Sequence, residues 1–298
     1  MDKIHIEKGS VQETLILPLY ARKLCAEQFP TLYQDEYAAK ICESIDYDFS
    51  QFKSKEKCVM YQFGALEGAM REKDMLWEIT DYLKEHPKAA VVNLGCGLNM
   101  TGRTADNGTC HIYNLDFPEV IKSRCELMPA EEREENIACN LNDFSWMDQI
   151  NAEEGAVFYA AGVFHYFTTL QIKKMVIAMA DRFPGGRLVF DAVGKFGRDM
   201  LMKFTLKNMG MNNISALFYV SDESELEGWS PKVKLKTKKA ICRVIISSMI
   251  RISKASTVFL QSSVTRLQRC IFIEWNSQSE KKEMGHLMNR NIKRIRNT

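Results

Sequence analysis

A glycine turn between two apolar segments constrains the fold of this chain more than any other feature. Residues 89–94 are apolar and run into a turn that contains Gly95 and Gly97, and a second apolar segment, residues 111–116, ends in a carboxylate. This order is typical of the βαβ unit that places a nucleoside-bearing cofactor over the carboxyl ends of parallel strands. Glycines let the backbone approach such a ligand because they have no Cβ. The Asp116 carboxylate is then expected to accept hydrogen bonds from the two ribose hydroxyls.

The spacing of the glycines discriminates between two classes of cofactor. The dinucleotide fingerprint has a third glycine three residues after the second, where it allows a helix to seat a pyrophosphate on its N-terminus. Here Met100 occupies that position, and Gly102 lies two residues later. S-Adenosylmethionine has no pyrophosphate and tolerates this looser turn, so it is favoured over a nicotinamide dinucleotide. A tight turn without a ligand is the alternative for the glycines alone. The strand before the turn also carries a polar residue, Asn93.

The rhythm of apolar segments predicts the architecture around this turn. Short apolar segments alternate with helical stretches. The apolar segments are expected to be strands and lie at residues 89–94, 111–116, 136–139, 156–161 and 187–191. Before the last strand, Thr168 and Gln171 form a capping-box pattern, and Pro184-Gly185-Gly186 ends the helix. The apolar face of this helix consists of Ile172, Met175, Val176, Met179 and Phe183. Strand and helix alternation predicts an α/β fold with a parallel sheet and right-handed crossovers.

The segments on either side of this pattern differ from it. Residues 1–88 are predicted to be helical without strands, and one helix should stop before His86-Pro87. Its apolar face is expected to contain Leu66, Met70, Trp77, Ile79 and Leu83. After residue 191 we expect an irregular insertion at about 195–237, a helix near 239–251 and a late strand at 267–275. The chain is thus divided into three parts. They are a helical N-terminal extension, 1–88, which is expected to contribute to a cap, a cofactor-binding domain, 89–276, with a cap insertion at about 195–237, and a basic tail, 277–298.

Composition excludes several partner classes. The formal net charge of +2 gives no reason to expect a nucleic acid partner. No uncharged apolar run reaches the 18 residues of a membrane span, and the N-terminus lacks the apolar core of a signal peptide. The nine cysteines contain no Cys-x-x-Cys pair, which argues against a metal site or a disulfide framework. We therefore expect a cytoplasmic protein. The sequence gives no prediction of its oligomeric state.

Several motifs resemble one known family. They are Val92-Asn-Leu-Gly-Cys-Gly, Asn114-Leu-Asp-Phe-Pro-Glu-Val-Ile, Ala160-Ala-Gly-Val-Phe-His-Tyr-Phe and segments 13–22, 207–210 and 229–231. From about residue 10 to 275 the chain resembles the leucine carboxyl methyltransferase family, in its branch of tetracenomycin-type polyketide O-methyltransferases. The resemblance implies a class I S-adenosylmethionine-dependent methyltransferase fold. That fold is a Rossmann-like seven-stranded sheet with a helical N-terminal extension and an inserted substrate cap.

The resemblance also implies roles for individual residues. In the family, the glycine turn approaches the amino-acid part of the cofactor, an acid binds the ribose, and an Asp-Leu pair lies near the adenine. A glycine after the fourth strand marks the methionine end, and an N-terminal arginine pairs with the cofactor carboxylate. The corresponding residues here are Gly95, Cys96, Gly97, Asp116, Asn140, Leu141, Gly162 and Arg71.

Some of these assignments have alternatives. Asn140 replaces the usual Asp, and Asp143 is an alternative adenine-side acid or the start of a loop. Arg71 alone would suit a solvated helix face. Many relatives have a Glu just before the glycine, where this chain has Ala161.

The chemistry suggested is methyl transfer to oxygen. A carboxylic acid with a pKa of about 4 is already ionised at neutral pH and needs no base, whereas a phenol with a pKa of about 10 does. The resemblance favours the carboxylate of a small aromatic or polyketide-like acid. His165 is then a residue of the substrate wall, with general base as the alternative. Tyr166 and Phe167 are expected to serve packing. Methylation of a protein C-terminal carboxylate, a non-catalytic cofactor-binding module and a nicotinamide-dependent oxidoreductase are the competing hypotheses.

Overall fold

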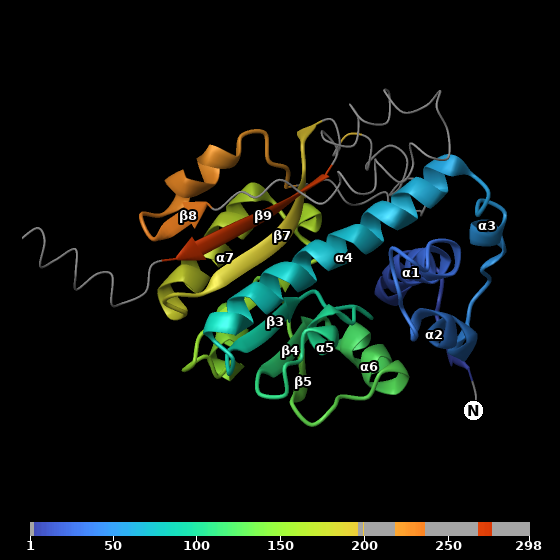
Figure 1. The fold of residues 1–298 in the computed structure, drawn as a ribbon, viewed down its shortest axis with the longest axis horizontal. Coiled ribbons are helices and arrows are strands. Elements are labelled where there is room, and N and C mark those ends of the chain that lie inside the picture. The colour runs from blue at the N-terminus through green and yellow to red at the C-terminus, as the bar shows by residue number, and fades with distance from the viewer. Residues whose placement is uncertain (1–2, 196–198, 200–217, 236–267, 276–298) are drawn as a thin grey trace, which may run out of the picture.

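The centre of the protein is one seven-stranded sheet. The computed structural model describes residues 3–195, 199, 218–235 and 268–275 (Figure 1). The strand order is β5-β4-β3-β6-β7-β9-β8, and β9 runs antiparallel to both of its neighbours. The strands are β3 (Ala90–Leu94), β4 (His111–Asp116), β5 (Glu134–Ala138), β6 (Ala156–Ala160), β7 (Arg187–Val193), β8 (Val233–Leu235) and β9 (Gln268–Trp275). The predicted seven-stranded sheet is confirmed. Its strand order reverses between β3 and β6, where open α/β sheets bind ligands.

Helix α7 (Thr169–Arg182) covers one face of the sheet. The predicted capping box is present, because the Thr168 side chain accepts from the Gln171 backbone and the Gln171 side chain accepts from the Thr168 backbone. All five residues of its predicted apolar face are buried against the strands. A 3-10 helix, Phe144–Gln149, joins the same core through the buried Trp146.

Helix α4 (Val59–Glu85) lies across the opposite face of the sheet (Figure 1). It ends before Pro87, as predicted. A stripe of Met75, Ile79, Tyr82 and Leu83 packs on Val91, Val157 and Val189. The prediction that Trp77 belongs to the apolar face is wrong, because its side chain is 44% exposed. Trp77 lies two residues from Met75 and from Ile79, which turns it away from the stripe. Helix α4 is a layer of the cofactor-binding domain, although it precedes residue 89.

The residues before α4 pack against the loop that follows β3. They form the 3-10 helix Val11–Leu15, α1 (Ile16–Gln28), α2 (Ala38–Ser44) and α3 (Ser50–Lys53). Ile16 and Leu19 share a buried cluster with Leu98 and Met100. Two short parallel strands, β1 (Ile4–His5) and β2 (Ile45–Asp46), were not predicted. Each has two residues and so shows no alternation. Helices α5 (Thr101–Thr104) and α6 (Pro118–Leu127) complete the β3–β5 half.

The end of the predicted insertion at 195–237 belongs to the sheet. Its end contains the 3-10 helix Glu223–Trp229 and then β8, which pairs with β9 as the edge strand. The expectation that the whole segment forms a cap is therefore wrong for residues 233–235. Most of the expected cap, the expected helix near 239–251 and the basic tail lie outside the described residues.

The described residues also bear on the expectations from composition. Seven cysteines among them are free thiols: Cys25, Cys42, Cys58, Cys96, Cys110, Cys125 and Cys139. Within the same residues, no His, Cys, Asp and Glu side chains gather in a group that could hold a metal ion. None of the helices described there has both the length and the apolar character to cross a membrane.

Candidate active site

The predicted site residues meet at the carboxyl edge of the sheet. Gly95 follows β3, Asp116 ends β4, Asn140 lies two residues after β5, and Gly162 lies two residues after β6. The carboxyl ends of parallel strands share one edge, so residues from four strands are brought together here.

The glycine turn has a backbone shape that requires glycine. Gly95 has φ 69° and Gly97 has φ 46°, which are left-handed conformations. The amides of Gly95 and Cys96 both donate to the Leu115 carbonyl oxygen, at 2.8 and 2.9 Å. A Cβ on Gly95 would lie 2.6 Å from a methyl carbon of Val163. The Cys96 side chain is buried, and burial raises the pKa of its thiol, so it stays protonated. Cys96 contributes backbone to this turn, and its thiol is not a nucleophile.

Asp116 holds the turn closed. Its Oδ2 atom accepts from the Gly97 amide and its Oδ1 atom from the Phe117 amide, both at 2.8 Å. Burial raises the pKa of the Asp116 carboxyl, although the two amides and Arg124 oppose that shift. Each carboxylate oxygen has two lone pairs, so the amides leave capacity for ribose hydroxyls.

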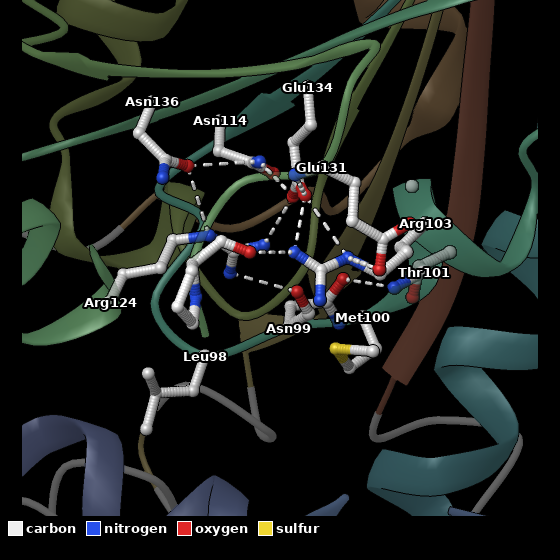
Figure 2. A network of polar contacts seen from close by, with 12 residues as sticks. Leu98, Asn99, Met100, Thr101, Arg103, Asn114, Arg124, Glu131, Glu134 and Asn136 are labelled. Carbon is white, nitrogen blue, oxygen red and sulfur yellow. Dashed lines mark hydrogen bonds and ion pairs between the residues drawn. The ribbon is translucent and has the colours of Figure 1, made fainter. Parts of the chain in front are cut away.

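Two buried arginines bind the loop after the turn by its carbonyl oxygens. Arg124 of α6 donates from Nη1 to the carbonyls of Gly97 and Asn99, both at 3.0 Å (Figure 2). Arg22 of α1 donates to the carbonyl between them, that of Leu98, at 2.8 Å. The three successive carbonyls are thus fixed from two directions, and the turn is held in place before any ligand binds.

The charge of Arg124 is balanced inside the protein. Its Nη2 atom bonds to Glu134 of β5 at 3.1 Å, and both side chains are only 1% exposed. Figure 2 shows Arg124 and Arg103 converging on Glu134, which also accepts from Asn114 at 2.7 Å. Burial alone would raise the pKa of Glu134, but the two arginines bring it below its ordinary value.

This network was not predicted from the sequence. The available signal was Arg124 itself, four residues after the buried Val120 and therefore on the apolar face of α6.

A second network forms where the methionine end of the cofactor is expected. Arg71 of α4 pairs with Asp191 of β7 at 3.1 Å, and the other Asp191 oxygen accepts from the Gly162 amide at 2.6 Å. A Cβ on Gly162 would lie 3.1 Å from Arg71 Nη1. Asp191 therefore holds the Arg71 guanidinium over Gly162. Arg71 is 18% exposed, so the alternative of a fully solvated charge does not describe it. Asp191 was not predicted as a site residue, although it is an acid in an apolar strand, as Asp116 is.

The residues expected near the adenine form a polar turn beside β5. Asn140 is exposed, and its side-chain oxygen accepts from the Asn142 amide at 3.0 Å. Leu141 is buried. The Asp143 side chain accepts from the Ser145 amide at 3.1 Å and caps the 3-10 helix that follows. The loop start at Asp143 is confirmed, and a role beside the adenine stays a prediction for it.

The residues after β6 form the edge expected to face the acceptor. His165 lies in the 3-10 helix Phe164–Tyr166, with its ring centroid 4.5 Å from that of Tyr166. Burial lowers the pKa of His165, Asp191 raises it and Arg71 lowers it, with a net decrease, so the imidazole is neutral at pH 7. Phe167 packs against the core, as predicted. Tyr166 is 41% exposed, so the packing prediction is wrong for it.

Two curated proteins are similar in sequence. The tetracenomycin polyketide synthesis O-methyltransferase of Streptomyces glaucescens is 28% identical over 189 residues, 63% of this chain and 68% of that protein. An S-adenosyl-L-methionine-dependent methyltransferase of Gibberella zeae is 23% identical over 254 residues, 80% of this chain and 85% of that protein. No family model matches the chain.

Solved structures show the same fold. The CurJ carbon methyltransferase is 14% identical with a TM-score of 0.50, covering 89% of this chain and 70% of that one. An O-methyltransferase family protein from Burkholderia thailandensis is 16% identical with a TM-score of 0.46, covering 88% of this chain and 72% of that one. The likeness to the CurJ structure, together with the seven-stranded sheet, shows that the fold is that of a class I methyltransferase.

The predicted resemblance to tetracenomycin-type O-methyltransferases is also confirmed, and the relatives support the predicted enzyme class and cofactor.

The residues at the carboxyl edge fit S-adenosylmethionine. Asn93, on the α4 side of β3, is 1% exposed, and neither polar atom of its side chain has a hydrogen-bond partner within the described residues. Buried polar groups normally have partners, so Asn93 is suited to a polar ligand group or a water molecule. Helix α5 has four residues and gives no N-terminus for a pyrophosphate. The edge thus suits a nucleoside with an amino-acid tail better than a dinucleotide.

Proposed function

We propose that this protein transfers a methyl group from S-adenosylmethionine to a carboxylate oxygen of a small aromatic or polyketide-like acid. The observation that carries the proposal is the grouping of the glycine turn, Asp116 and the Arg71–Gly162 contact at one edge. The similarity to a protein of tetracenomycin polyketide synthesis supports the acceptor class. A cytoplasmic location stays a prediction.

Each residue at the edge has a binding task toward the cofactor. Gly95 and Gly97 let the backbone approach it, Asp116 would accept from the ribose hydroxyls, and Arg71 would bind the carboxylate. The Asn140-Leu141 turn would lie beside the adenine, with Leu141 as the apolar contact. When bound, the cofactor supplies an electrophilic methyl carbon on a sulfonium sulfur.

The acceptor then needs position more than activation. An ionised carboxylate is already a nucleophile, and placing it in line with the methyl carbon supplies most of the acceleration. His165 has a lowered pKa and is neutral at pH 7, which suits a residue of the substrate wall. The same neutral imidazole could accept a proton, so methylation of a phenol is the second candidate function. A protein C-terminal carboxylate is less favoured, because Ala161 replaces the Glu found in many relatives.

Replacing His165 with alanine separates the two acceptors. With an acid acceptor and saturating cofactor, kcat should fall less than the factor of about 10²–10⁴ typical of losing a general base. The rate should also stay flat from about pH 6 to 9, because the acid ionises near 4. With a phenol, wild-type activity should fall only at a pH below the ordinary pKa of histidine, because the pKa of His165 is lowered and the imidazole takes up its proton at lower pH. The variant should then be inactive at pH 7 and recover toward about pH 10 as the phenol ionises.

The experiment uses methyl transfer from labelled S-adenosylmethionine to a panel of aromatic acids and phenols. His111→Ala is the matched control, because that histidine begins β4 at the opposite edge and pairs with Glu135. Recovery of His165→Ala activity at high pH would contradict the carboxylate assignment. Cofactor binding without turnover on any acceptor would instead identify a non-catalytic module.

A further inference from the structure

Glu67 is a buried acid that the catalytic scheme above does not use. It lies on α4 four residues before Arg71, so the two side chains are neighbours on one helix face, about 6 Å apart along the axis. Its Oε1 atom is buried and has no hydrogen-bond partner in the described part of the chain. Burial raises the pKa of Glu67 to about 7, while Arg71 lowers it and Asp191 raises it. A buried carboxyl oxygen without a partner is uncommon and needs an explanation.

The position of Glu67 follows from how α4 runs. The helix leads into β3 through a short turn, so the two elements are antiparallel and the N-terminal half of α4 lies toward the carboxyl edge of the sheet (Figure 1). Met75 packs beside Val91 in the middle of the sheet, and Arg71, one turn earlier, reaches Gly162 beyond the end of β6. Glu67 is one further turn along the same face, at the place expected for the amino-acid end of the cofactor.

The charges at this place are incomplete for that ligand. The amino-acid end carries a carboxylate and an ammonium group on one carbon. Arg71 offers a guanidinium to the carboxylate. The charge of Asp191 is already balanced by Arg71, with which it forms an ion pair, and Ala161 offers no acid after β6. Among the described residues at this place, Glu67 is therefore the carboxyl group left to meet the ammonium.

We propose that Glu67 binds the α-ammonium group of S-adenosylmethionine, so that Glu67 and Arg71 together recognise the zwitterionic end of the cofactor. This inference rests on the proposed function, because it assigns a residue within the same cofactor site. It makes Glu67 a binding residue for the cofactor and not a base for the acceptor. The charged groups that act on Glu67 are Arg71 on α4 and Asp191 on β7, and the same two groups act on His165 after β6.

Calorimetry with three cofactor analogues tests the assignment without any acceptor. S-Adenosylhomocysteine has the whole amino acid, decarboxylated S-adenosylmethionine keeps only the ammonium, and 5′-deoxy-5′-methylthioadenosine has neither group. Glu67→Gln should weaken binding of the first two by about tenfold or more and leave the third unchanged, since an ion pair to a buried carboxylate is lost. Glu67→Asp should keep part of the affinity. Glu85→Gln is the matched control, at the exposed end of the same helix.

The possible outcomes separate the inference from the proposed function. Unchanged affinity of Glu67→Gln for S-adenosylhomocysteine would overturn the role of Glu67. An equal loss for 5′-deoxy-5′-methylthioadenosine would overturn it too, because it would show a general disturbance of the site. If the wild-type protein bound none of the three analogues, the proposed function itself would fail.

Discussion

Replacing Arg124 with methionine is expected to lower the free energy of unfolding by about 3 kcal/mol or more, because breaking a buried ion pair leaves an uncompensated charge. Arg124 and Glu134 are each 1% exposed, and Arg124 also binds the carbonyls of Gly97 and Asn99. Arg103 remains beside Glu134 and limits the loss. Urea unfolding followed by circular dichroism measures the effect.

A neighbouring arginine provides the control for Arg124. Arg133 pairs with Asp106 at 2.6 Å but is 35% exposed, so Arg133→Met should cost much less stability than Arg124→Met, because solvent screens an exposed ion pair. The double variant Arg124→Met with Glu134→Gln should regain part of the lost stability, because residue 134 is then neutral and Arg103 keeps its ion pair with Glu131. Equal losses for Arg124→Met and Arg133→Met would contradict the view that the network holds the loop.

Replacing Gly95 with valine is expected to abolish measurable cofactor binding. The position has φ 69°, which a β-branched residue rarely adopts, and its Cβ would lie 2.6 Å from Val163. The turn must therefore move away from the place where its backbone approaches the ligand. Calorimetry with S-adenosylhomocysteine measures the loss.

Gly108→Val separates backbone strain from the site. Gly108 has φ 83°, but a Cβ there would meet nothing within 4 Å, and the residue lies before β4, away from the carboxyl edge. This variant should cost stability and keep cofactor affinity. If Gly95→Val bound S-adenosylhomocysteine as well as Gly108→Val does, the turn could not approach the cofactor closely.

The sequence predicted those parts of the fold that have a strong local signal. The strands β3, β4, β6 and β7 are apolar segments with turn residues at their ends, so they can be recognised in the sequence. The capping box of α7 follows a sequence pattern that marks the start of a helix. The three-residue strand β8 is too short to show a period and owes its place to pairing with β9. Trp77 was misplaced because apolar character alone does not fix which face of a long helix is buried.

The candidate site divides in the same way. Gly95, Asp116 and Gly162 were predicted because strand ends, glycines and terminal acids lie close together in the sequence. The supporting contacts join distant segments: Arg22 binds a carbonyl 76 residues away, and Arg71 pairs with an acid 120 residues away. A charged residue on an apolar face, such as Arg124, signals that some partner exists but does not say which one.

The central claim is that the carboxyl edge of this sheet binds S-adenosylmethionine. Replacing Asp116 and measuring cofactor affinity tests this claim most directly. The measurement is the affinity for S-adenosylmethionine of the wild-type protein, of Asp116→Ala and of Asp148→Ala, an exposed acid that pairs with Arg182. Asp116→Ala should bind more than about tenfold more weakly, because two ribose hydroxyls and the Gly97 amide lose their acceptor, a loss on the order of 1–3 kcal/mol. Asp148→Ala should bind as the wild type does. Equal affinity in all three proteins, or no binding by the wild type, would contradict the account.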